Sequence, residues 1–274
     1  MILLIASGKD TASINIAEHV LKHYPFAKTN QAFQETPVYS ADIAGKKVTF
    51  IMLKEEAVNA QDLPDNFVNL ELMVFISRHS SQSGKPTLSV HTPGNFASAE
   101  LGGLPSTVSI SPANAMQDAL KALKRLKEEM RLDYEVTYEC THHGPSLNVP
   151  AMFVELGSSP KQWSDLNAAS AVAQAAMEAI INFGKSKQPA VLGIGGTHYN
   201  QKFTNMALNG EAAFGHMIPK YAIQFVDSEI LRQCLERTLE RNELAILDWK
   251  GIKSEDKQKL LILMQEVGLP FKKA

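Results

Sequence analysis

Cysteine is scarce in this sequence: Cys140 and Cys234 are the only two among 274 residues. Two cysteines cannot form a disulfide framework, so we expect the protein to work in a reducing compartment such as the cytoplasm. The apolar run at the amino terminus, Met1–Ala6, is far shorter than the roughly twenty residues that span a bilayer. It also lacks the basic start and the cleavage site of a signal peptide. We therefore interpret it as a buried strand of a soluble protein.

An excess of charge of one sign is also absent. The 27 Lys and Arg residues nearly balance the 29 Asp and Glu residues, which gives a formal net charge of −2. There is no global basic field that would coat long stretches of DNA or RNA, although a local patch for one RNA end remains compatible with this balance. We expect neither DNA nor a membrane as a partner, and nothing in the sequence demands more than a monomer.

Strand and helix signals alternate along the chain. The runs Val48–Leu53 and Leu70–Ile76 are almost continuously apolar, which indicates strands covered on both faces. The clearest helix runs from Pro112 to about Leu132, with Ser111 as its predicted cap and Pro112 in its first position. Further strands are predicted at Met1–Ala6, Thr87–Val90, Tyr134–Cys140, Ala151–Leu156, Ala190–Ile194, Tyr221–Val226 and Ala245–Asp248, and further helices at Thr11–His23, Asp165–Phe183, Ser228–Arg241 and Ser254–Val267.

This alternation predicts the α/β class. The length would allow one large domain or two small ones, but no repeat, low-complexity tract or Gly/Ser linker divides the chain. We therefore expect a single catalytic domain over residues 1–274, with three α/β/α layers and a mixed, mostly parallel sheet.

Histidines collect where the predicted strands end. Ligands of open α/β sheets bind beyond the carboxyl ends of the strands, and five of the eight histidines follow predicted strands: His79, His91, His142, His143 and His198. One such histidine is more often structural than functional, but five at corresponding positions predict a shared site. His216 follows a glycine in another predicted loop. His19 and His23 lie one turn apart on the first helix, where a solvated face explains them better than a metal.

Neutral imidazole is the commonest metal ligand, and a carboxylate can complete a catalytic zinc site while water holds one position. The sequence contains no His-Glu-x-x-His or Cys-x-x-Cys spacing. The supply of ligands alone therefore favours zinc, as one or two ions. We expect Cys140 to pack in the core and not to ligate.

Glu155 lies within the apolar run Ala151–Leu156, where a carboxylate is costly unless it is paired or bound to a metal. A general base or a metal ligand explains it. The alternative is an alternating strand that carries Glu155 on a solvated face.

The segment Gly193–Thr197 is rich in glycine but lacks the Gly-x-Gly-x-x-Gly order and the Gly-Lys-Ser/Thr ending of nucleotide-binding loops. We expect these glycines to let a substrate approach the backbone closely. Ser146, Ser158 and Ser159 lack the Gly-x-Ser-x-Gly elbow of serine hydrolases, so we interpret them as polar lining of the site.

Six segments of the chain carry the polar residues discussed above. In chain order they are Ser77-Arg-His79, His91-Thr-Pro-Gly-Asn95, Thr141-His-His-Gly-Pro-Ser146, Glu155-Leu-Gly-Ser-Ser159 with Trp163, Gly193-Ile-Gly-Gly-Thr-His-Tyr199 with Lys202-Phe-Thr204, and Gly215-His216. In this order they closely resemble the archaeal-type D-aminoacyl-tRNA deacylases (D-tyrosyl-tRNA deacylases) over nearly the whole chain. The resemblance implies an enzyme that hydrolyses the ester between a D-amino acid and tRNA. It also implies zinc, and a core similar to phosphorylase/hydrolase-type and peptidyl-tRNA hydrolase folds.

From this resemblance we assign roles to the residues as hypotheses. Zinc would be held by some of His79, His142, His143 and His198, and Glu155, His143 and Thr141 would be catalytic, with Glu155 as the general base. The substrate would contact Arg78, His91, Asn95, Gly144, Ser146, Ser158, Gly195, Gly196, Thr197, Tyr199, Lys202, Phe203 and His216.

Proteins usually read a single-stranded tRNA end by stacking and backbone contacts. Tyr199, Phe203 and Phe96 are candidate stacking platforms, with packing in the core as the alternative for each. Arg78 and Lys202 are candidate partners of a phosphate or carboxylate. A row of cations could hold the acceptor stem, although a solvated helix face explains it more simply: Lys121, Lys124, Arg125 and Lys127.

Two other functions stay open at the level of sequence. The first is a zinc-dependent hydrolase of peptides or small amides that uses the same site and needs no RNA. The second is a non-catalytic protein that binds tRNA ends through its histidines without a metal.

Overall fold

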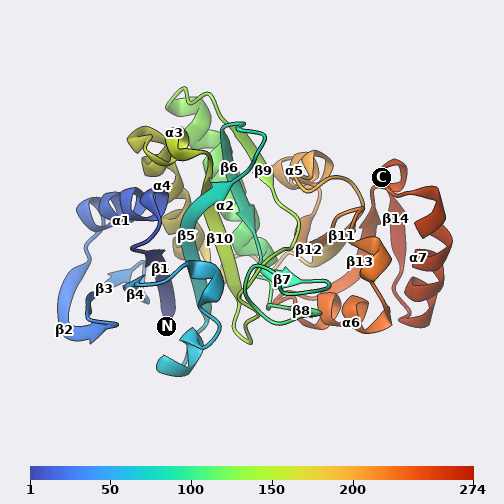
Figure 1. The fold of residues 1–274 in the computed structure, drawn as a ribbon, viewed down its shortest axis with the longest axis horizontal. Coiled ribbons are helices and arrows are strands. Elements are labelled where there is room, and N and C mark those ends of the chain that lie inside the picture. The colour runs from blue at the N-terminus through green and yellow to red at the C-terminus, as the bar shows by residue number, and fades with distance from the viewer.

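The computed structural model describes residues 1–274 and contains two main β-sheets, the larger on the left and centre of Figure 1 and the smaller on the right. The larger sheet has eight strands in the order β2-β3-β4-β1-β5-β10-β6-β9. Its strands are β1 Ile2–Ser7, β2 Ala27–Phe33, β3 Thr36–Ile43, β4 Lys46–Leu53, β5 Leu72–Ser80, β6 Thr87–His91, β9 Glu135–Tyr138 and β10 Ala151–Ser158.

Directions in the larger sheet are mixed. Strands β4, β1, β5 and β10 are parallel to one another, and the hairpin β2–β3 adds antiparallel strands at one edge. At the other edge β6 runs antiparallel to β10 and parallel to β9. The α/β class with a mixed, mostly parallel sheet is thus confirmed. The hairpin β2–β3 is an addition that the apolar pattern does not predict, because most of its residues are partly or fully exposed.

The smaller sheet is entirely parallel, in the order β12-β11-β13-β14. Its strands are β11 Ala190–Ile194, β12 Ala213–Ile218, β13 Asn242–Leu247 and β14 Phe271–Lys273, and a separate two-stranded ladder joins β7 Gly94–Asn95 to β8 Thr107–Val108. The predicted strand Tyr221–Val226 is wrong, because that segment contains the 3-10 turn η3, Ile223–Phe225. The strand lies upstream, and His216 therefore sits within β12 and not in a loop.

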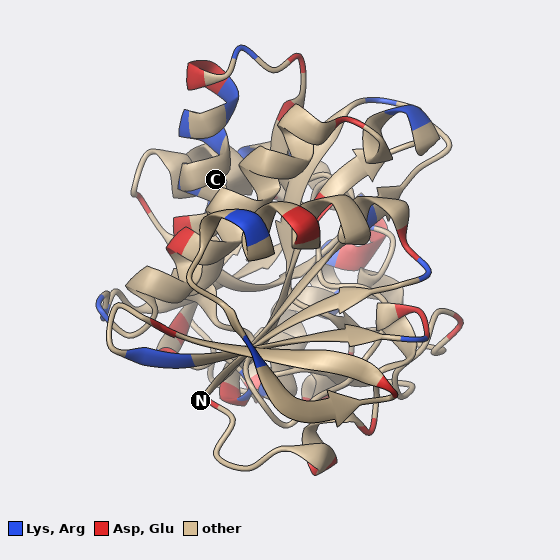
Figure 2. Ribbon diagram, turned by 90° about the vertical axis from the view of Figure 1, so that its left-hand side faces the viewer, with Lys and Arg blue, Asp and Glu red and all other residues tan.

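Seven α-helices connect these strands. They are α1 Thr11–His23, α2 Ala113–Glu129, α3 Pro160–Trp163, α4 Leu166–Asn182, α5 Gln201–Leu208, α6 Ser228–Glu236 and α7 Ser254–Glu266, and further 3-10 turns are η1 Ala57–Asn59, η2 Leu63–Asn66 and η4 Trp249–Gly251. None of the helices is both long and apolar enough to cross a membrane. Lys and Arg are interspersed with Asp and Glu along the ribbon (Figure 2), in line with the balanced sequence.

The start of α2 differs from the prediction. Pro112 is the cap residue without a side-chain hydrogen bond, and the Glu240 carboxylate accepts from the amides of Ala113 and Asn114 at 2.9 Å each. Ser111 does not cap the helix; it forms a bridge with Thr238. Helix α6 ends at Glu236, short of the predicted Arg241, and the bridge residue Thr238 and Glu240 follow it outside the helix.

The two faces of the larger sheet differ in what covers them. Even-numbered core residues such as Leu4, Val74 and Val154 pack against α1, α2 and α4. Odd-numbered residues such as Phe75 and Phe153 pack under η1, η2 and the long loops. Because side chains alternate along a strand, the residues that continue the odd series, including Glu155, lie on the loop-covered face.

Helix α2 also packs on β12, so it lies between the two sheets. Apolar residues of both sheets, Val74 and Phe214 among them, belong to one buried cluster. Helices cover both faces of the smaller sheet, with α2 and α5 on one side and α6 and α7 on the other. On this shared core we propose that residues 1–274 form a single domain.

Candidate active site

A cavity of about 430 Å³ lies on the loop-covered face of β5 and β10. Four predicted histidines and Arg78 line it together with Glu155 and with residues that the sequence did not single out. The lining consists of Asp10, Glu56, Ala57, Val58, Ser77, Arg78, His79, Ser80, Leu101, His142, His143, Phe153, Glu155 and His198.

Glu155 forms the floor of this cavity. It pairs with Ser77 on β5 and with Ser89 on β6, and only 3% of its surface is exposed, so the solvated-face alternative is wrong. Its Oε1 accepts a hydrogen bond from Ser77 Oγ at 2.6 Å. Burial by itself raises the pKa of this carboxyl, but contacts with His79 and His91 outweigh burial and lower it to about 2. Glu155 is therefore an ionised carboxylate inside the protein.

Glu139 is a second buried carboxylate that the sequence analysis missed. It follows β9 and has no exposed surface. Its carboxylate oxygens lie 2.9 Å from Nε2 of His198, 3.1 Å from Nδ1 of His79 and 3.5 Å from Nε2 of His142. Burial favours the neutral carboxyl, but these imidazoles hold the pKa of Glu139 well below its usual range. In the sequence Glu139 occupies a polar position of an alternating strand, and such a position is normally exposed, so the pattern does not predict its burial.

Each of the five predicted site histidines uses one ring nitrogen for a hydrogen bond with the surrounding protein. His142 Nδ1 lies 2.9 Å from the Cys140 carbonyl, and His143 Nδ1 lies 2.7 Å from the Gly144 carbonyl. His91 Nδ1 is 3.3 Å from the carbonyl of Thr92.

The other two histidines bond to tyrosines. His79 Nε2 lies 2.5 Å from the Tyr199 hydroxyl, and His198 Nδ1 lies 3.1 Å from the Tyr221 hydroxyl. The second nitrogens of His79, His91, His142 and His198 face Glu139 or Glu155 at 2.9 to 3.6 Å. An outer hydrogen bond that fixes the ring, with the inner nitrogen left for a ligand, is the usual arrangement around a bound metal.

The route by which these residues meet differs from the prediction. Because β6 and β9 run against β10, their carboxyl ends do not lie at the edge where β5 and β10 end. His91 instead pairs with Phe153 in the middle of β10, and it reaches the site because both side chains belong to the loop-covered face. His198 arrives from the loop after β11, which a bridge between Glu139 and Tyr199 fastens to the end of β9.

Three sets of side chains place their ligand atoms within 4.8 Å of one another: His91 with His142 and His143, Glu139 with His142 and His198, and His79 with Glu139 and Glu155. Two buried atoms in these sets, His91 Nε2 and Glu139 Oε1, lie near a charged neighbour but have no hydrogen bond of good geometry. Burial also lowers the pKa of His142 well below its usual range and that of His143 to about 4, so both rings are neutral, as ligands must be. The donor set therefore fits a metal ion.

His79 behaves differently from these two. Burial lowers its pKa, but contacts with Glu139 and Glu155 raise it to about 11 when only protein groups surround it. A cation is thus favoured between the two carboxylates. Protonated His79 provides this positive charge here, and a metal ion bound at the same place would provide it instead.

Of the predicted substrate residues, Arg78 and His91 lie beside the histidine cluster together with Tyr199. Arg78 lines the cavity, bonds Glu56 Oε1 at 2.9 Å and lies over the ring of Trp163. His91 is fully buried, so it faces Glu155 and not the open cavity. The sequence placed His91 in contact with the substrate, and from this position we propose it as a candidate metal ligand.

Other predicted residues lie in structural positions. Phe203 is buried against Phe214, and Phe96 is buried among apolar residues around the smaller sheet, so neither presents a face to RNA. Thr141 Oγ1 lies 3.1 Å from Nδ1 of His216, whose Nε2 meets two backbone carbonyls. These two residues pair with each other and not with the cavity.

The remaining polar residues hold the loops of the site together. Asn95 donates to the carbonyls of Gly102 and Leu104, Ser146 Oγ donates to the carbonyl of Thr107, and Ser158 Oγ donates to the carbonyl of Lys85. Gly144 packs directly on Gly102 and Gly103.

Two groups lie away from the cavity. Helix α2 covers the opposite face of the sheet, and two of its cations pair with Glu128, Glu129 and Glu178, so its positive row is a solvated helix face. Gly196, Thr197 and Lys202 line another, smaller cavity, and Gly195 belongs to the same loop.

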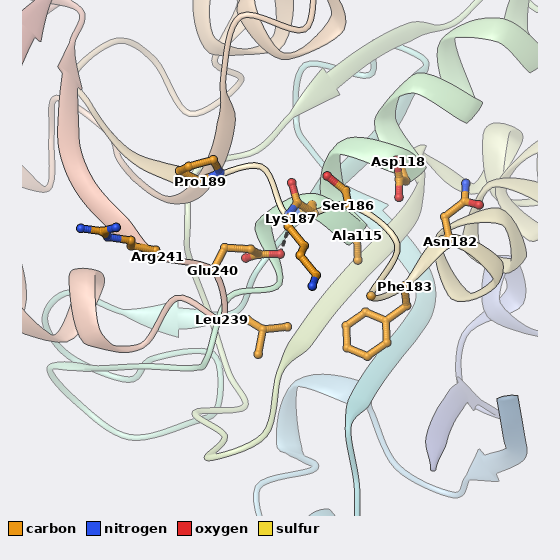
Figure 3. A pocket seen from close by; sticks show the side chains of 12 residues that line it. Ala115, Asp118, Asn182, Phe183, Ser186, Lys187, Pro189, Leu239, Glu240 and Arg241 are labelled. Atoms are coloured by element: carbon orange, nitrogen blue, oxygen red, sulfur yellow. Dashed lines mark hydrogen bonds between the residues drawn. The ribbon is translucent and has the colours of Figure 1, made fainter.

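A further cavity of about 320 Å³ lies near the amino ends of β11 and β13 (Figure 3). It contains Lys187 and Glu240, and burial raises the pKa of Glu240 above its usual range. No histidine lines it. The Glu240 carboxylate accepts hydrogen bonds from the first amides of α2, so we do not place the chemistry in this cavity.

Known proteins share the sequence and the fold of this chain. Residues 66–272 match the family model described as D-aminoacyl-tRNA deacylase. The chain is 35% identical over 278 residues to the D-aminoacyl-tRNA deacylase of Thermococcus onnurineus and 36% identical over 277 residues to that of Pyrococcus abyssi, and in both pairs the match covers 99% of each chain. Among solved structures, a conserved protein of unknown function, AF0625, matches with a TM-score of 0.88 and 30% identity over 100% of this chain and 95% of the other.

Proposed function

The chain belongs to the D-aminoacyl-tRNA deacylase family, and from this premise we propose that it hydrolyses the ester bond of D-aminoacyl-tRNA, such as D-tyrosyl-tRNA. The products are the free D-amino acid and tRNA. We further propose that the enzyme is cytoplasmic and monomeric and that it binds the acceptor end of aminoacyl-tRNA.

The observation that carries this proposal is the pair of buried, ionised carboxylates, Glu139 and Glu155, ringed by five histidines at a cavity of about 430 Å³. Two anions in one buried site are costly unless cations neutralise them. Ester hydrolysis needs an activated water and a positive centre near the ester carbonyl oxygen, and two buried anions that attract a cation support the proposal that this site provides both.

We propose zinc as that positive centre, held by Glu139, His142 and His198. Two histidines and one glutamate form a common ligand set of catalytic zinc, which leaves one position open. Both of these imidazoles line the cavity. When bound there, zinc supplies a water whose pKa is lowered toward about 7 and polarises the ester carbonyl. The set His91, His142 and His143 shares His142 with the first, and His142 has only its Nε2 free for a metal, so the two sets are alternative sites for one ion.

The groups of the chain itself carry the proton transfers. Glu155, ionised and held by Ser77 Oγ, accepts a proton from the attacking water and passes it to the ribose oxygen that leaves. His79 lies beside Glu155 and is fixed by Tyr199, so it orients that carboxylate. Arg78 lines the cavity and pairs with Glu56, and we propose it as a partner for an anionic group of the RNA.

Release of labelled tyrosine from D-tyrosyl-tRNA and L-tyrosyl-tRNA tests the proposal, each with and without a chelator. We expect hydrolysis of the D-ester alone, lost on chelation and restored by zinc. Hydrolysis of the D-ester that resists the chelator would support the proposed reaction and contradict the proposed role of zinc. Well-folded protein that hydrolyses neither ester in the presence of zinc contradicts the proposed function.

Two variants separate the carboxylates. Glu155→Gln should lower the single-turnover rate by at least about 100-fold while zinc content stays near that of the wild type. Glu139→Gln should lower zinc affinity, and activity should return at high zinc concentration. Unchanged hydrolysis by Glu155→Gln rules it out as the base. Lys28→Ala, on the exposed edge strand β2, is the matched control.

A further inference from the structure

A separate cavity of about 230 Å³ lies beyond the carboxyl ends of β11, β12 and β13. Ligands of parallel α/β sheets bind at this edge. No hydrophobic side chain lines the cavity, which consists of Gly196, Thr197, Asn200, Gln201, Lys202, Lys220, Asp248 and Gly251. Nucleic-acid bases are held by aromatic or apolar faces, so this polar lining suits a phosphate group and not a base.

The cavity shares a loop with the candidate active site. Thr197 lines this second cavity, and the next residue, His198, places its Nε2 2.9 Å from Glu139. Consecutive Cα atoms lie about 3.8 Å apart. A flexible substrate whose ester lies beside His198 therefore has to pass around only this loop to enter the second cavity.

The charges around the cavity favour an anion. Lys202 Nζ bonds Asp248 Oδ1 at 2.6 Å, which neutralises that carboxylate. The exposed Lys220 makes no ion pair or hydrogen bond through its ammonium group, so the lining keeps one positive charge in excess.

Backbone amides add to this charge. Gly195 and Gly196 have φ angles of +106° and +78°, and the turn that they form leaves the amides of Thr197 and His198 without an acceptor in the protein. Successive amides that point outward from a turn of this kind make a concave anion site.

We propose that this cavity binds a backbone phosphate of the single-stranded aminoacyl-tRNA end while the ester lies at Glu155. Lys220 and the amide of Thr197 make the contacts, and Lys202 is held in place by Asp248. This inference rests on the proposed function, because it takes the substrate to be an RNA ester. A free phosphate ion has the same chemistry, and the experiment below distinguishes the two sources.

Lys220→Ala tests the contact, with Lys28→Ala as the matched loss of one exposed lysine far from the cavity. Two quantities are measured at several salt concentrations: the Kd of deacylated tRNA and the KM for D-tyrosyl-tRNA. We expect both to rise about fivefold, which corresponds to one exposed ion pair. The slope of log Kd against log salt should fall by about 0.7, the value for one phosphate of a single strand.

The comparison substrate is D-tyrosine ethyl ester, which carries no phosphate. Its hydrolysis should be unaffected by Lys220→Ala, and Lys220→Arg should restore the affinity for tRNA. Equal losses on the ethyl ester and on tRNA indicate a disturbed loop and overturn the proposal, as does an unchanged Kd and salt slope. Inorganic phosphate that inhibits ester hydrolysis through Lys220, with tRNA affinity independent of Lys220, also overturns it. If the wild type hydrolyses no aminoacyl-tRNA, the proposed function fails, while the Kd of deacylated tRNA still decides the phosphate contact.

Discussion

Gly157 allows a direct test of how tightly the candidate site is packed. It pairs with His79 on β5 and with Thr87 on β6, on the same face as Glu155. A Cβ at position 157 would lie 2.7 Å from the Cβ of His79 and 2.7 Å from Oγ1 of Thr87. To restore a contact of 3.4 Å, each neighbour must withdraw by about 0.7 Å. Gly157→Ala therefore acts on His79 without changing any charge.

His79 has little room to withdraw. Its Nε2 bonds the Tyr199 hydroxyl at 2.5 Å, its Nδ1 faces both carboxylates, and its carbonyl accepts from the Trp163 indole at 2.9 Å. Overpacking of this kind costs about 1–3 kcal/mol of the free energy of unfolding. Because misplacement of a catalytic group by about 1 Å costs roughly 100-fold in rate, we expect kcat/KM for D-tyrosyl-tRNA to fall by about 10- to 100-fold.

Single-turnover hydrolysis and urea unfolding of Gly157→Ala measure the two effects. Gly8→Ala is the matched control, because its Cβ would find its nearest neighbour at an ordinary 3.4 Å. Thr87 Oγ1 has no hydrogen-bond partner, so Thr87→Ala removes one of the two clashes without breaking a bond. In that background stability should recover in part, while the clash with His79 and the loss of activity persist. A stable Gly157→Ala protein with the wild-type rate would refute the reasoning that places His79 in the site.

Three further predictions concern residues outside the cluster. Phe203→Ala should lower the free energy of unfolding by about 3–5 kcal/mol in urea titration, because Phe203 is fully buried; an exposed stacking platform would instead change KM with little effect on stability. Glu240→Ala removes the acceptor of two amides at the start of α2, so the free energy of unfolding should fall by about 1–2 kcal/mol, and an unchanged urea midpoint contradicts that role. Burial lowers the pKa of His216 to about 4, so the stability gained from its neutral form is complete above its unfolded pKa of 6.5 and lost as the pH falls toward 4. That loss amounts to about 3 kcal/mol, and His216→Gln should make the urea midpoint of chelated protein less dependent on pH over this range; an identical pH dependence in both proteins contradicts it.

Local patterns in the sequence were enough for much of the fold. The helix Thr11–His23 and the strand Ala190–Ile194 have the predicted bounds, because hydrophobic periodicity and a capping Asp10 act within a few residues. The same is true of the α/β class and of the choice of five histidines as the residues to examine. Each of these inferences needs only neighbours along the chain.

The arrangement of the strands depends on contacts between distant segments. The sequence does not reveal that β6 and β9 run against β10, or that the last strands form a second sheet. A strand has the same apolar pattern in either direction, since its side chains alternate with period two regardless of its partner. Which sheet edge it joins is decided by pairing across the fold.

Glu139 and Phe203 show the same limit at the level of single residues. Glu139 occupies a polar position of an alternating strand, and side chains from distant segments, among them His79 and His198, pack against it. Phe203 lies beside the glycine-rich motif in sequence, yet α5 turns it into the core against Phe214. The sequence by itself determined most of the helices and buried strands and the types of reactive groups. The tertiary structure decided which of these groups meet, because burial is a property of the packing around a side chain and not of its neighbours in the chain.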